Sequence, residues 1–261
     1  MNYALVTGAV INTGVAIVEK LAAEGLNVVF TGRDAAKVAA AEANYRAKFP
    51  DVSILGYAID SHKADGTFDE ESVIRMFEVL DEKEIFINAL VLNAAHQGLN
   101  QTFLESPLSE FLAVLNTNVT WNYCFAREGA KRMIPQGGGS ITFINSNTAY
   151  RTIADRTSYI TSKGGQLGLM RSLALDLGKY NIRVNAVLPG MIRTQRWIDN
   201  PGFYAKNPCR FTPLGDVADG TDVADAVWYF ISAARNTTGA ELVVDGGNTV
   251  QLYPIIPSSE Q

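Results

Sequence analysis

The sequence predicts a doubly wound α/β fold, in which helices cover both faces of a seven-stranded parallel sheet. Short apolar runs alternate with longer segments whose apolar residues recur every three to four positions. The short runs are mostly apolar on both faces, which is typical of parallel strands buried between helices. No linker rich in Pro, Gly or Ser divides the chain, so we expect one domain over residues 1–261.

The predicted strands and helices follow one another in strict alternation. The apolar runs predict strands at residues 3–7, 27–31, 52–59, 87–92, 140–146, 183–188 and 241–244. The periodic segments between them predict helices at residues 13–24, 34–48, 68–83, 107–134, 157–179 and 220–234. Helices between successive strands imply right-handed crossovers, and hence a Rossmann-like sheet.

Local signals justify several boundaries in turn. Apolar side chains between residues 15 and 22 form one face of the first helix. Asp34 is placed to cap the second helix, and the D-E-E-S run at residues 69–72 is suited to cap and begin the third. The three glycines at residues 137–139 form the turn that feeds the fifth strand.

Two stretches carry no regular pattern. Residues 191–213 contain several prolines and aromatic side chains, and they leave the sixth strand at the sheet edge where α/β folds bind ligands. We therefore expect them to form a substrate lid. Within the tail, residues 248–261, the segment 251–257 is unusually apolar for a free terminus, which favours docking on a neighbouring subunit.

Composition and charge exclude several functional classes. The chain is 47% hydrophobic and 19% charged, which excludes a disordered protein. A net charge of -5 argues against a protein that tracks nucleic-acid phosphates. The sequence has neither a secretory signal pattern nor a membrane-spanning apolar stretch, so we expect a cytoplasmic protein without a membrane partner.

Cysteine and histidine are too few to build a metal centre or a disulfide framework. The spacing of Cys124, Cys209, His62 and His96 does not fit a zinc site. We therefore predict no bound metal, and cysteines that pack as small apolar groups in a reducing compartment.

The first predicted strand runs into a glycine-rich turn. Residues 7–14 read T-G-A-V-I-N-T-G and lead directly into the first helix. Such a turn lets backbone N–H groups and a helix N-terminus approach a pyrophosphate. Its spacing (Gly8, Asn12, Gly14) differs from G-x-G-x-x-G, but asparagine tolerates the positive φ of a glycine turn. Taken alone, the turn is also consistent with a purely structural strand–helix connection.

A second motif places Tyr159 and Lys163 four residues apart, and therefore on one face of a predicted helix. A tyrosine titrates near pH 10, too high for acid–base chemistry at neutral pH. A neighbouring ammonium favours the phenolate, and a bound nicotinamide cation adds to that effect. The pair by itself also occurs by chance in many helices.

These motifs together resemble the short-chain dehydrogenase/reductase family. Ser146 precedes Tyr159 by 13 positions at the end of a predicted strand, and residues 7–14 resemble the family's T-G-x-x-x-G-x-G turn with Asn12 in place of the middle glycine. Further matching segments are L-V-L-N-A-A (90–95), L-N-T-N-V (115–119), I-R-V-N-A-V-L-P-G (182–190) and T-G-A-E-L-V-V-D-G-G (238–247). Leu92 and Ala95 depart from the family's N-N-A-G.

The resemblance implies roles for individual residues. Ser146 would hold the substrate oxygen, and Tyr159 would be the acid and base. Lys163 would lower the pKa of Tyr159 and bind the nicotinamide ribose, and Asn118 would position a water-linked proton relay behind it. The cofactor contacts implied are Gly8, Asn12, Gly14, Asp60, Asn93, Tyr159, Lys163, Pro189, Gly190 and Thr194.

The activity that the resemblance implies is hydride transfer between NAD(P) and a secondary alcohol or ketone of small size. Two alternatives stay open: a 3-oxoacyl thioester reductase, and a non-catalytic NAD(P)-binding sensor on the same fold. The aromatic residues of the predicted lid suit a sugar or steroid face. Four arginines near the presumed pocket suit a carboxylate or phosphate group, but the interpretation slightly favoured is that they are solvated loop residues; they are Arg151, Arg193, Arg196 and Arg210.

The end of the second predicted strand favours NADP(H) over NAD(H). Gly32 stands where folds of this class place the acid that binds the ribose 2′-hydroxyl. Arg33 follows and can pair with a 2′-phosphate, although Asp34 is next to it. Ile11 stands where many NADP-dependent relatives carry a second basic residue.

The sequence also predicts a homo-oligomer, either a tetramer or a dimer. The helices at residues 107–134 and 157–179 carry more apolar side chains than one sheet face can cover. On the first of them these are Phe111, Leu115, Trp121, Tyr123 and Phe125. In the family that the chain resembles, these two helices pair across a twofold axis.

Overall fold

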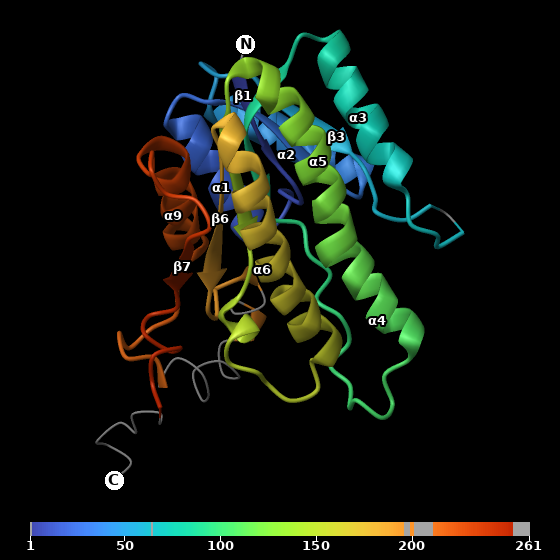
Figure 1. Cartoon of the computed structure of the whole chain (residues 1–261), viewed down its shortest axis with the longest axis vertical. Helices are drawn as coiled ribbons and strands as arrows, with labels where there is room; N and C mark the ends of the chain where they lie inside the picture. Colours follow the sequence, from blue (N-terminus) through green and yellow to red (C-terminus); the bar gives the residue numbers. More distant parts are fainter. Residues whose placement is uncertain (1, 64, 196–198, 201–210, 253–261) are drawn as a thin grey trace.

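One parallel sheet of seven strands runs through the centre of the molecule in the computed structural model (Figure 1). The structure describes residues 2–63, 65–195, 199–200 and 211–252. The strands lie in the order β3-β2-β1-β4-β5-β6-β7. Their bounds are β1 (Asn2–Val6), β2 (Asn27–Gly32), β3 (Ile54–Ala58), β4 (Phe86–Leu92), β5 (Gly139–Ile144), β6 (Ile182–Pro189) and β7 (Glu241–Val244). The predicted fold class is confirmed.

The strand order changes direction at β1, which pairs with β2 on one side and β4 on the other. Val6, the last residue of β1, is in register with Phe30 and Val91. Chains that leave β1 and β4 therefore diverge to opposite sides and open a crevice at the carboxyl edge of the sheet. This edge carries the candidate site.

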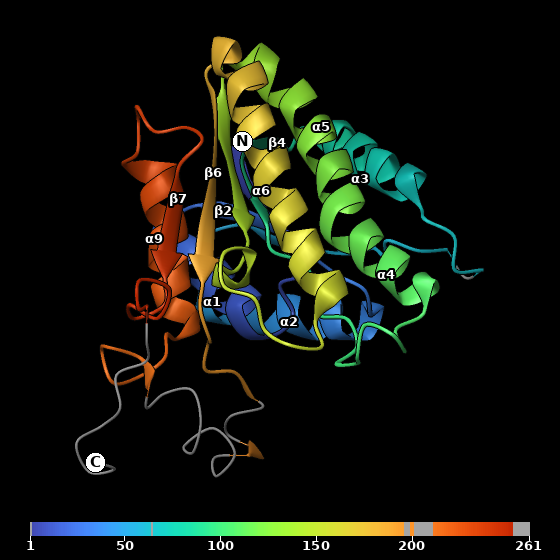
Figure 2. The same ribbon diagram turned by 60° about the horizontal axis from the view of Figure 1, so that its bottom comes forward.

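Helices cover both faces of the sheet (Figure 2). One layer contains α3 (Glu70–Glu82), α4 (Leu108–Leu115), α5 (Trp121–Met133) and α6 (Thr157–Leu177). The other layer contains α1 (Asn12–Ala23), α2 (Ala35–Lys48) and α9 (Gly220–Ser232). Each layer has its own buried core, one around Phe77, Phe125 and Met170, the other around Ile17 and Phe230. Among the described residues, no helix is both long and apolar enough to cross a membrane.

Most predicted boundaries agree with the structure to within two residues. Asp34 caps α2 as predicted, because its carboxylate accepts hydrogen bonds from the backbone N–H groups of Ala36 (2.9 Å) and Lys37 (3.1 Å). Asp69 likewise caps α3 through the N–H of Ser72 (3.2 Å). These caps satisfy donors that a helix start leaves unpaired.

The single helix predicted over residues 107–134 is wrong in one respect. A π-helical turn, η1 (Asn116–Thr120), separates α4 from α5. The turn frees the carbonyl of Asn118, which accepts hydrogen bonds from the side chains of Asn122 (2.8 Å) and Gln166 (2.6 Å). The apolar spacing continues across the turn, so sequence periodicity does not detect it. Such insertions are frequent at functional sites.

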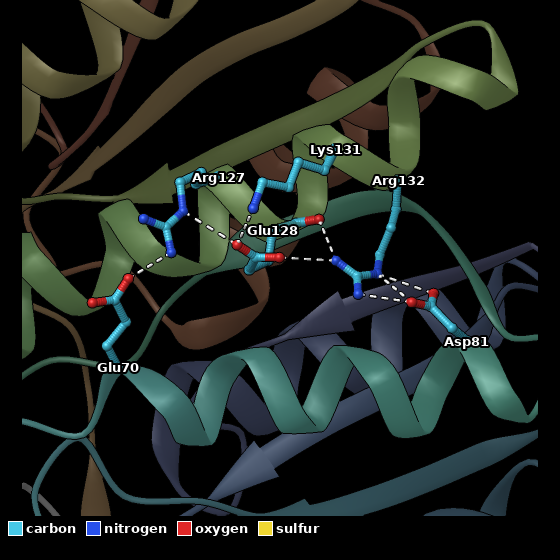
Figure 3. Close-up of polar contacts among 6 residues, drawn as sticks. All are labelled: Glu70, Asp81, Arg127, Glu128, Lys131 and Arg132. Atoms are coloured by element: carbon cyan, nitrogen blue, oxygen red, sulfur yellow. Dashed lines mark hydrogen bonds and ion pairs between the residues drawn. The ribbon is translucent and has the colours of Figure 1, made fainter.

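An ion network joins α5 to α3 (Figure 3). Glu128 is buried on α5 and pairs with Arg127 (3.2 Å), Lys131 (2.8 Å) and Arg132 (3.1 Å). The two arginines reach across to Glu70 and Asp81 at opposite ends of α3, at 2.6 and 2.7 Å. Because every charge has a partner of opposite sign, the network holds the two helices in a defined relative position.

Candidate active site

Ser146 and Tyr159 meet at the carboxyl end of β5. Ser146 lies just beyond this strand, and Tyr159 lies in the first turn of α6. The hydroxyl of Ser146 accepts hydrogen bonds from the backbone N–H (3.2 Å) and the hydroxyl (2.9 Å) of Thr148. Since both lone pairs of Ser146 are then used, its own proton is left to donate to the phenol oxygen of Tyr159 or to a substrate oxygen.

Burial raises the pKa of Tyr159. The hydrogen bond from Ser146 and the positive charge of Arg156 lower that pKa, but burial outweighs them. The guanidinium carbon of Arg156 lies 5.2 Å from the centre of the Tyr159 ring, and Gln97 hydrogen-bonds the phenol oxygen. Acid–base chemistry at neutral pH therefore requires something that lowers the pKa of Tyr159. A further positive charge close to the phenol, such as that of a nicotinamide cation, has this effect.

Lys163 lies one turn after Tyr159 and is almost completely buried. Its ammonium nitrogen donates to the carbonyl of Ile144 (2.9 Å) and to Oε1 of Gln166 (3.1 Å). The same nitrogen lies 5.5 Å from the centre of the Tyr159 ring. Burial lowers the pKa of Lys163 to about 7, so its charge at neutral pH depends on the few acceptors around it.

Asn118 is held on the π-helical turn by hydrogen bonds on both sides. Its side-chain oxygen accepts from the N–H of His96 (2.7 Å), and its amide donates to the carbonyl of His96 (2.9 Å) and the hydroxyl of Ser162 (2.9 Å). Its carbonyl accepts from Nε2 of Gln166. The Gln166 carboxamide contacts both Asn118 and Lys163 directly, while the water-linked relay behind Lys163 stays a prediction.

The glycine-rich turn has the shape that a pyrophosphate needs. Gly8 has φ 66° and Asn12 has φ 51°, so the prediction that Asn12 adopts the glycine-like conformation is confirmed. A Cβ at Gly14 would lie 2.5 Å from the carbonyl oxygen of Gly8. Ile11 stands at the N-cap of α1, and its apolar side chain accepts no hydrogen bond from the helix. The backbone N–H groups of the first turn of α1 are therefore not capped by this residue. The residues present therefore fit a dinucleotide phosphate group.

Known proteins match the chain over nearly its full length. A family model described as enoyl-(acyl carrier protein) reductase matches residues 8–249. The protein belongs to the short-chain dehydrogenase/reductase family. It is therefore an oxidoreductase, as predicted.

Individual relatives of this short-chain dehydrogenase/reductase differ in their substrates. L-rhamnose 1-dehydrogenase (NAD(P)(+)) of Azotobacter vinelandii is 34% identical over 256 residues, which are 95% of this chain and 96% of the relative. A 3-oxoacyl-[acyl-carrier-protein] reductase of Aquifex aeolicus is 30% identical, covering 93% and 95% of the two chains. A crystal structure titled as a putative gluconate dehydrogenase from Agrobacterium tumefaciens superposes with a TM-score of 0.87 at 32% identity, covering 96% and 97% of the two chains.

The other predicted cofactor contacts lie along the carboxyl edge of the sheet of this dehydrogenase/reductase. Asn93 follows β4, and its amide donates to the carbonyls of Thr7 (3.0 Å) and Gly8 (2.9 Å), which fastens the glycine turn to that strand. Gly190 follows Pro189 at the end of β6, and a Cβ there would lie 2.6 Å from Cβ of Asp245. Thr194 is half-buried in the segment beyond.

Arg33 and Asp60 lie at neighbouring strand ends, on the β2–β3 side of the crevice. Gly32 is in register with Ala58, which brings the two predicted contacts close in the fold. Asp60 accepts a hydrogen bond from the N–H of His62 (3.2 Å). Arg33 is exposed, and no hydrogen bond or ion pair of its guanidinium occurs among the described residues. This pair is not in contact with Tyr159.

Much of the predicted lid and tail lies outside the described residues. This applies to Trp197, Phe203, Tyr204, Arg196 and Arg210, and to the tail from residue 253 onward. Of the predicted pocket arginines within the description, Arg193 pairs with Asp216 (2.6 Å) and Asp219 (3.1 Å), and Arg151 donates to the carbonyl of Thr249 (3.1 Å). Arg193 is therefore held by two carboxylates of its own chain.

Three residues of the site were not singled out from the sequence: Gln97, Arg156 and Gln166. Arg156 precedes Tyr159 by three positions and Gln166 follows Lys163 by three, so both share a helix face with the residue they contact. Gln97 comes from the loop after β4, and its carbonyl accepts a hydrogen bond from Arg156 at 2.6 Å. Among the described residues, no group of three or more potential metal ligands is found.

Proposed function

We propose that the protein interconverts a secondary alcohol and a ketone, with Tyr159 as acid and base and NAD(P) as the hydride carrier. The observation that carries this proposal is the arrangement at Tyr159, whose phenol oxygen hydrogen-bonds Ser146 and whose ring lies 5.5 Å from the Lys163 ammonium. A nucleotide sensor has no need for this arrangement. When bound, the nicotinamide supplies or accepts the hydride.

In the reductive direction, each residue of the site has a defined part. The hydroxyl of Ser146 donates a hydrogen bond to the substrate carbonyl oxygen and so polarises the carbonyl group. Tyr159 then transfers its phenol proton to that oxygen, which becomes the hydroxyl of the product. Lys163 stabilises the phenolate that remains, and Tyr159 recovers a proton before the next turnover. In the oxidative direction the same proton returns from the alcohol to the phenolate.

The residues around Tyr159 support a polyhydroxylated substrate. Gln97 provides an amide at the phenol oxygen and Arg156 a guanidinium against the Tyr159 ring, and both groups bind hydroxyls or a carboxylate. The Azotobacter relative is named for a sugar, and the Agrobacterium structure is titled for a sugar acid. A sugar, a polyol or a sugar acid is therefore the substrate class we favour over a steroid.

A second candidate is reduction of a 3-oxoacyl thioester. The Aquifex relative supports it, since it is named for this reaction and covers almost the whole chain. A net charge of -5 gives little attraction for an acidic carrier protein. This reaction therefore ranks second.

The cofactor proposed is NADP(H) in preference to NAD(H). A Cβ at Gly32 would lie 2.7 Å from Val10 Cγ1 and 2.8 Å from Val38 Cγ2, so the acid that would select NAD could stand there only if both valines shifted. Arg33 is exposed at the strand end and able to pair with a 2′-phosphate. Asp34 does not compete for that arginine, because its carboxylate caps α2.

We further propose that the protein is cytoplasmic and forms a homo-oligomer, either a dimer or a tetramer. Exposed apolar side chains on the outer helices support association; they are Leu108, Leu112, Tyr123 and Leu175. Trp121 and Phe125, which the sequence places on the same helix, do not contribute to this surface, because both are buried in the core between α5 and the sheet. Sedimentation well above the 28.3 kDa of one chain is expected at micromolar concentration.

The proposed reaction is tested by a panel of sugars, polyols, sugar acids, hydroxysteroids and acetoacetyl thioesters with both cofactors. Absorbance of the reduced nicotinamide reports turnover. Activity confined to polyhydroxylated substrates supports the favoured class, and activity confined to the thioester supports the second candidate. Cofactor binding without turnover on any substrate would overturn the proposed function in favour of a sensor.

A further inference from the structure

Gln166 connects Lys163 to the π-helical turn by direct contact. The carboxamide is buried to 1% exposure on α6. Its Oε1 accepts from the Lys163 ammonium (3.1 Å) and from the amide of Asn145 (3.1 Å), and its Nε2 donates to the carbonyl of Asn118 (2.6 Å). The orientation of the amide is therefore determined, with the oxygen toward Lys163 and the nitrogen toward Asn118.

The position of Gln166 is not explained by the core alone. Its neighbours on the buried face of α6, Leu167 and Met170, are apolar, as a helix packed on a sheet requires. Asn145 retains a second acceptor, the carbonyl of Lys163 (2.9 Å), and the carbonyl of Asn118 retains a second donor from α5. The Lys163 ammonium depends most on Gln166, because among the described residues its only other hydrogen bond is to the Ile144 carbonyl.

We propose that Gln166 is a positioning residue, whose side-chain oxygen holds the Lys163 ammonium toward Tyr159. This inference rests on the proposed function, because it assigns Gln166 a part only if Lys163 supports Tyr159.

Few charged groups face this part of the site. Tyr159 and Arg156 come from α6 and the segment before it, and Arg156 lies against the Tyr159 ring. His96, from the loop after β4, contacts Asn118 through its backbone, while its ring lies 3.9 Å from Glu110. From β5, η1 and α6, the groups around the ammonium are uncharged carbonyls and amides. A change in pH dependence on replacing Gln166 is therefore traceable to Lys163 and Tyr159.

The test uses three variants of the full chain. Gln166→Met keeps the length of the side chain and removes the acceptor and the donor. Gln166→Glu keeps an acceptor for Lys163 and removes the donor to Asn118. Leu167→Met is the matched control, a volume-conserving change at the next buried position of the same helix.

The first readout needs neither cofactor nor activity. NMR of protein labelled with ¹³C at the lysine ε-carbon follows the titration of each lysine, and Lys163→Met assigns the signal of Lys163. Loss of a hydrogen bond to a charged group is expected to lower the pKa of Lys163 by about one unit in Gln166→Met. The pKa is expected to rise in Gln166→Glu and to stay unchanged in Leu167→Met.

The second readout is the pH profile of alcohol oxidation on the best substrate of the panel. Because a less cationic Lys163 stabilises the phenolate less, the acid limb of kcat is expected to move up by about one pH unit in Gln166→Met. In Gln166→Glu the acid limb is expected to stay at the wild-type position or to move below it. If Gln166→Met folds and leaves both the Lys163 titration and the acid limb unchanged, Gln166 is only a core residue and the inference fails. Failure of the proposed function is distinct, because it appears as an inactive wild type.

Discussion

The ammonium nitrogen of Lys163 lies 5.5 Å from the centre of the Tyr159 ring, one helical turn further along α6. Both residues are carried by the same regular helix, so their separation is set by helix geometry and does not depend on loop conformation. Ser146 approaches the phenol from β5. The acid–base group therefore has one partner from its own helix and one from the sheet.

Replacing Tyr159 with Phe keeps the ring packing and removes only the hydroxyl. We expect turnover to fall by about 10²–10⁴-fold, the usual contribution of a general acid or base. Cofactor affinity, measured by fluorescence titration, should change by less than about threefold, because at most one hydrogen bond between the Tyr159 hydroxyl and the cofactor is lost. A variant that keeps a tenth of the wild-type turnover would show that another group supplies the proton.

Replacing Lys163 with Met should abolish turnover and also change the pH dependence of stability. Burial lowers the pKa of Lys163 to about 7, whereas the unfolded chain titrates near 10.5. Between pH 7 and pH 10.5, Lys163 is therefore protonated in the unfolded chain but neutral in the folded protein. The free-energy cost of burying its charge is fully present below pH 7 and disappears as the pH rises toward 10.5. The Met variant lacks this penalty.

The measurement is the melting temperature of both cofactor-free proteins between pH 6 and pH 10. We expect the difference in favour of Lys163→Met to be largest below pH 7 and to shrink steadily above it. A difference that is the same at every pH would mean that the ammonium is not buried as the structure describes.

Replacing Arg33 with Ala tests the choice of cofactor. If the guanidinium pairs with a 2′-phosphate, kcat/KM with NADPH should fall by about tenfold or more, while kcat/KM with NADH changes little. Arg235→Ala is a suitable control, because Arg235 is an exposed arginine between α9 and β7, at the far edge of the sheet. Equal losses with the two cofactors, or a wild type that already prefers NADH, would contradict the assignment.

Glu128 should contribute to stability only above the pH at which it is protonated. Burial by itself would raise its pKa, but hydrogen bonds from Lys131 and Arg132 outweigh burial and lower it. A lowered carboxyl pKa stabilises the fold above the ordinary value near 4.3, and that stability is lost as the pH falls through the lowered value. Glu128→Gln should therefore cost about 2–4 kcal/mol of unfolding free energy at pH 7.

Urea unfolding at pH 7 and near pH 3 measures this effect. The cost of Glu128→Gln should be smaller at the lower pH, where the wild type also begins to lose the charge. Glu78→Gln, an exposed position on α3, should show a cost below about 0.5 kcal/mol at both pH values. An equal cost for the two variants at pH 7 would mean that the ion network does not hold α3 against α5.

The fold could be read from the sequence because its signals are local. Apolar runs and helical periods predicted all seven strands and the main helices, and the parallel sheet followed from their alternation. The positive φ at Asn12 and the caps at Asp34 and Asp69 were predictable for the same reason, since each depends on residues within one turn. The spacing of Tyr159 and Lys163 on one helix is also a local property.

Only the tertiary structure decided which side chains meet across elements. Gln166 lies against the Asn118 carbonyl, 48 positions earlier in the chain, because α6 packs beside a π-helical turn that no periodic pattern marks. Arg156 reaches the site while Arg193 is held by two aspartates, although both are arginines near the same edge. Composition and spacing determine which elements form, but the partners of a charged or amide side chain depend on which elements pack together and which polar groups are buried with it.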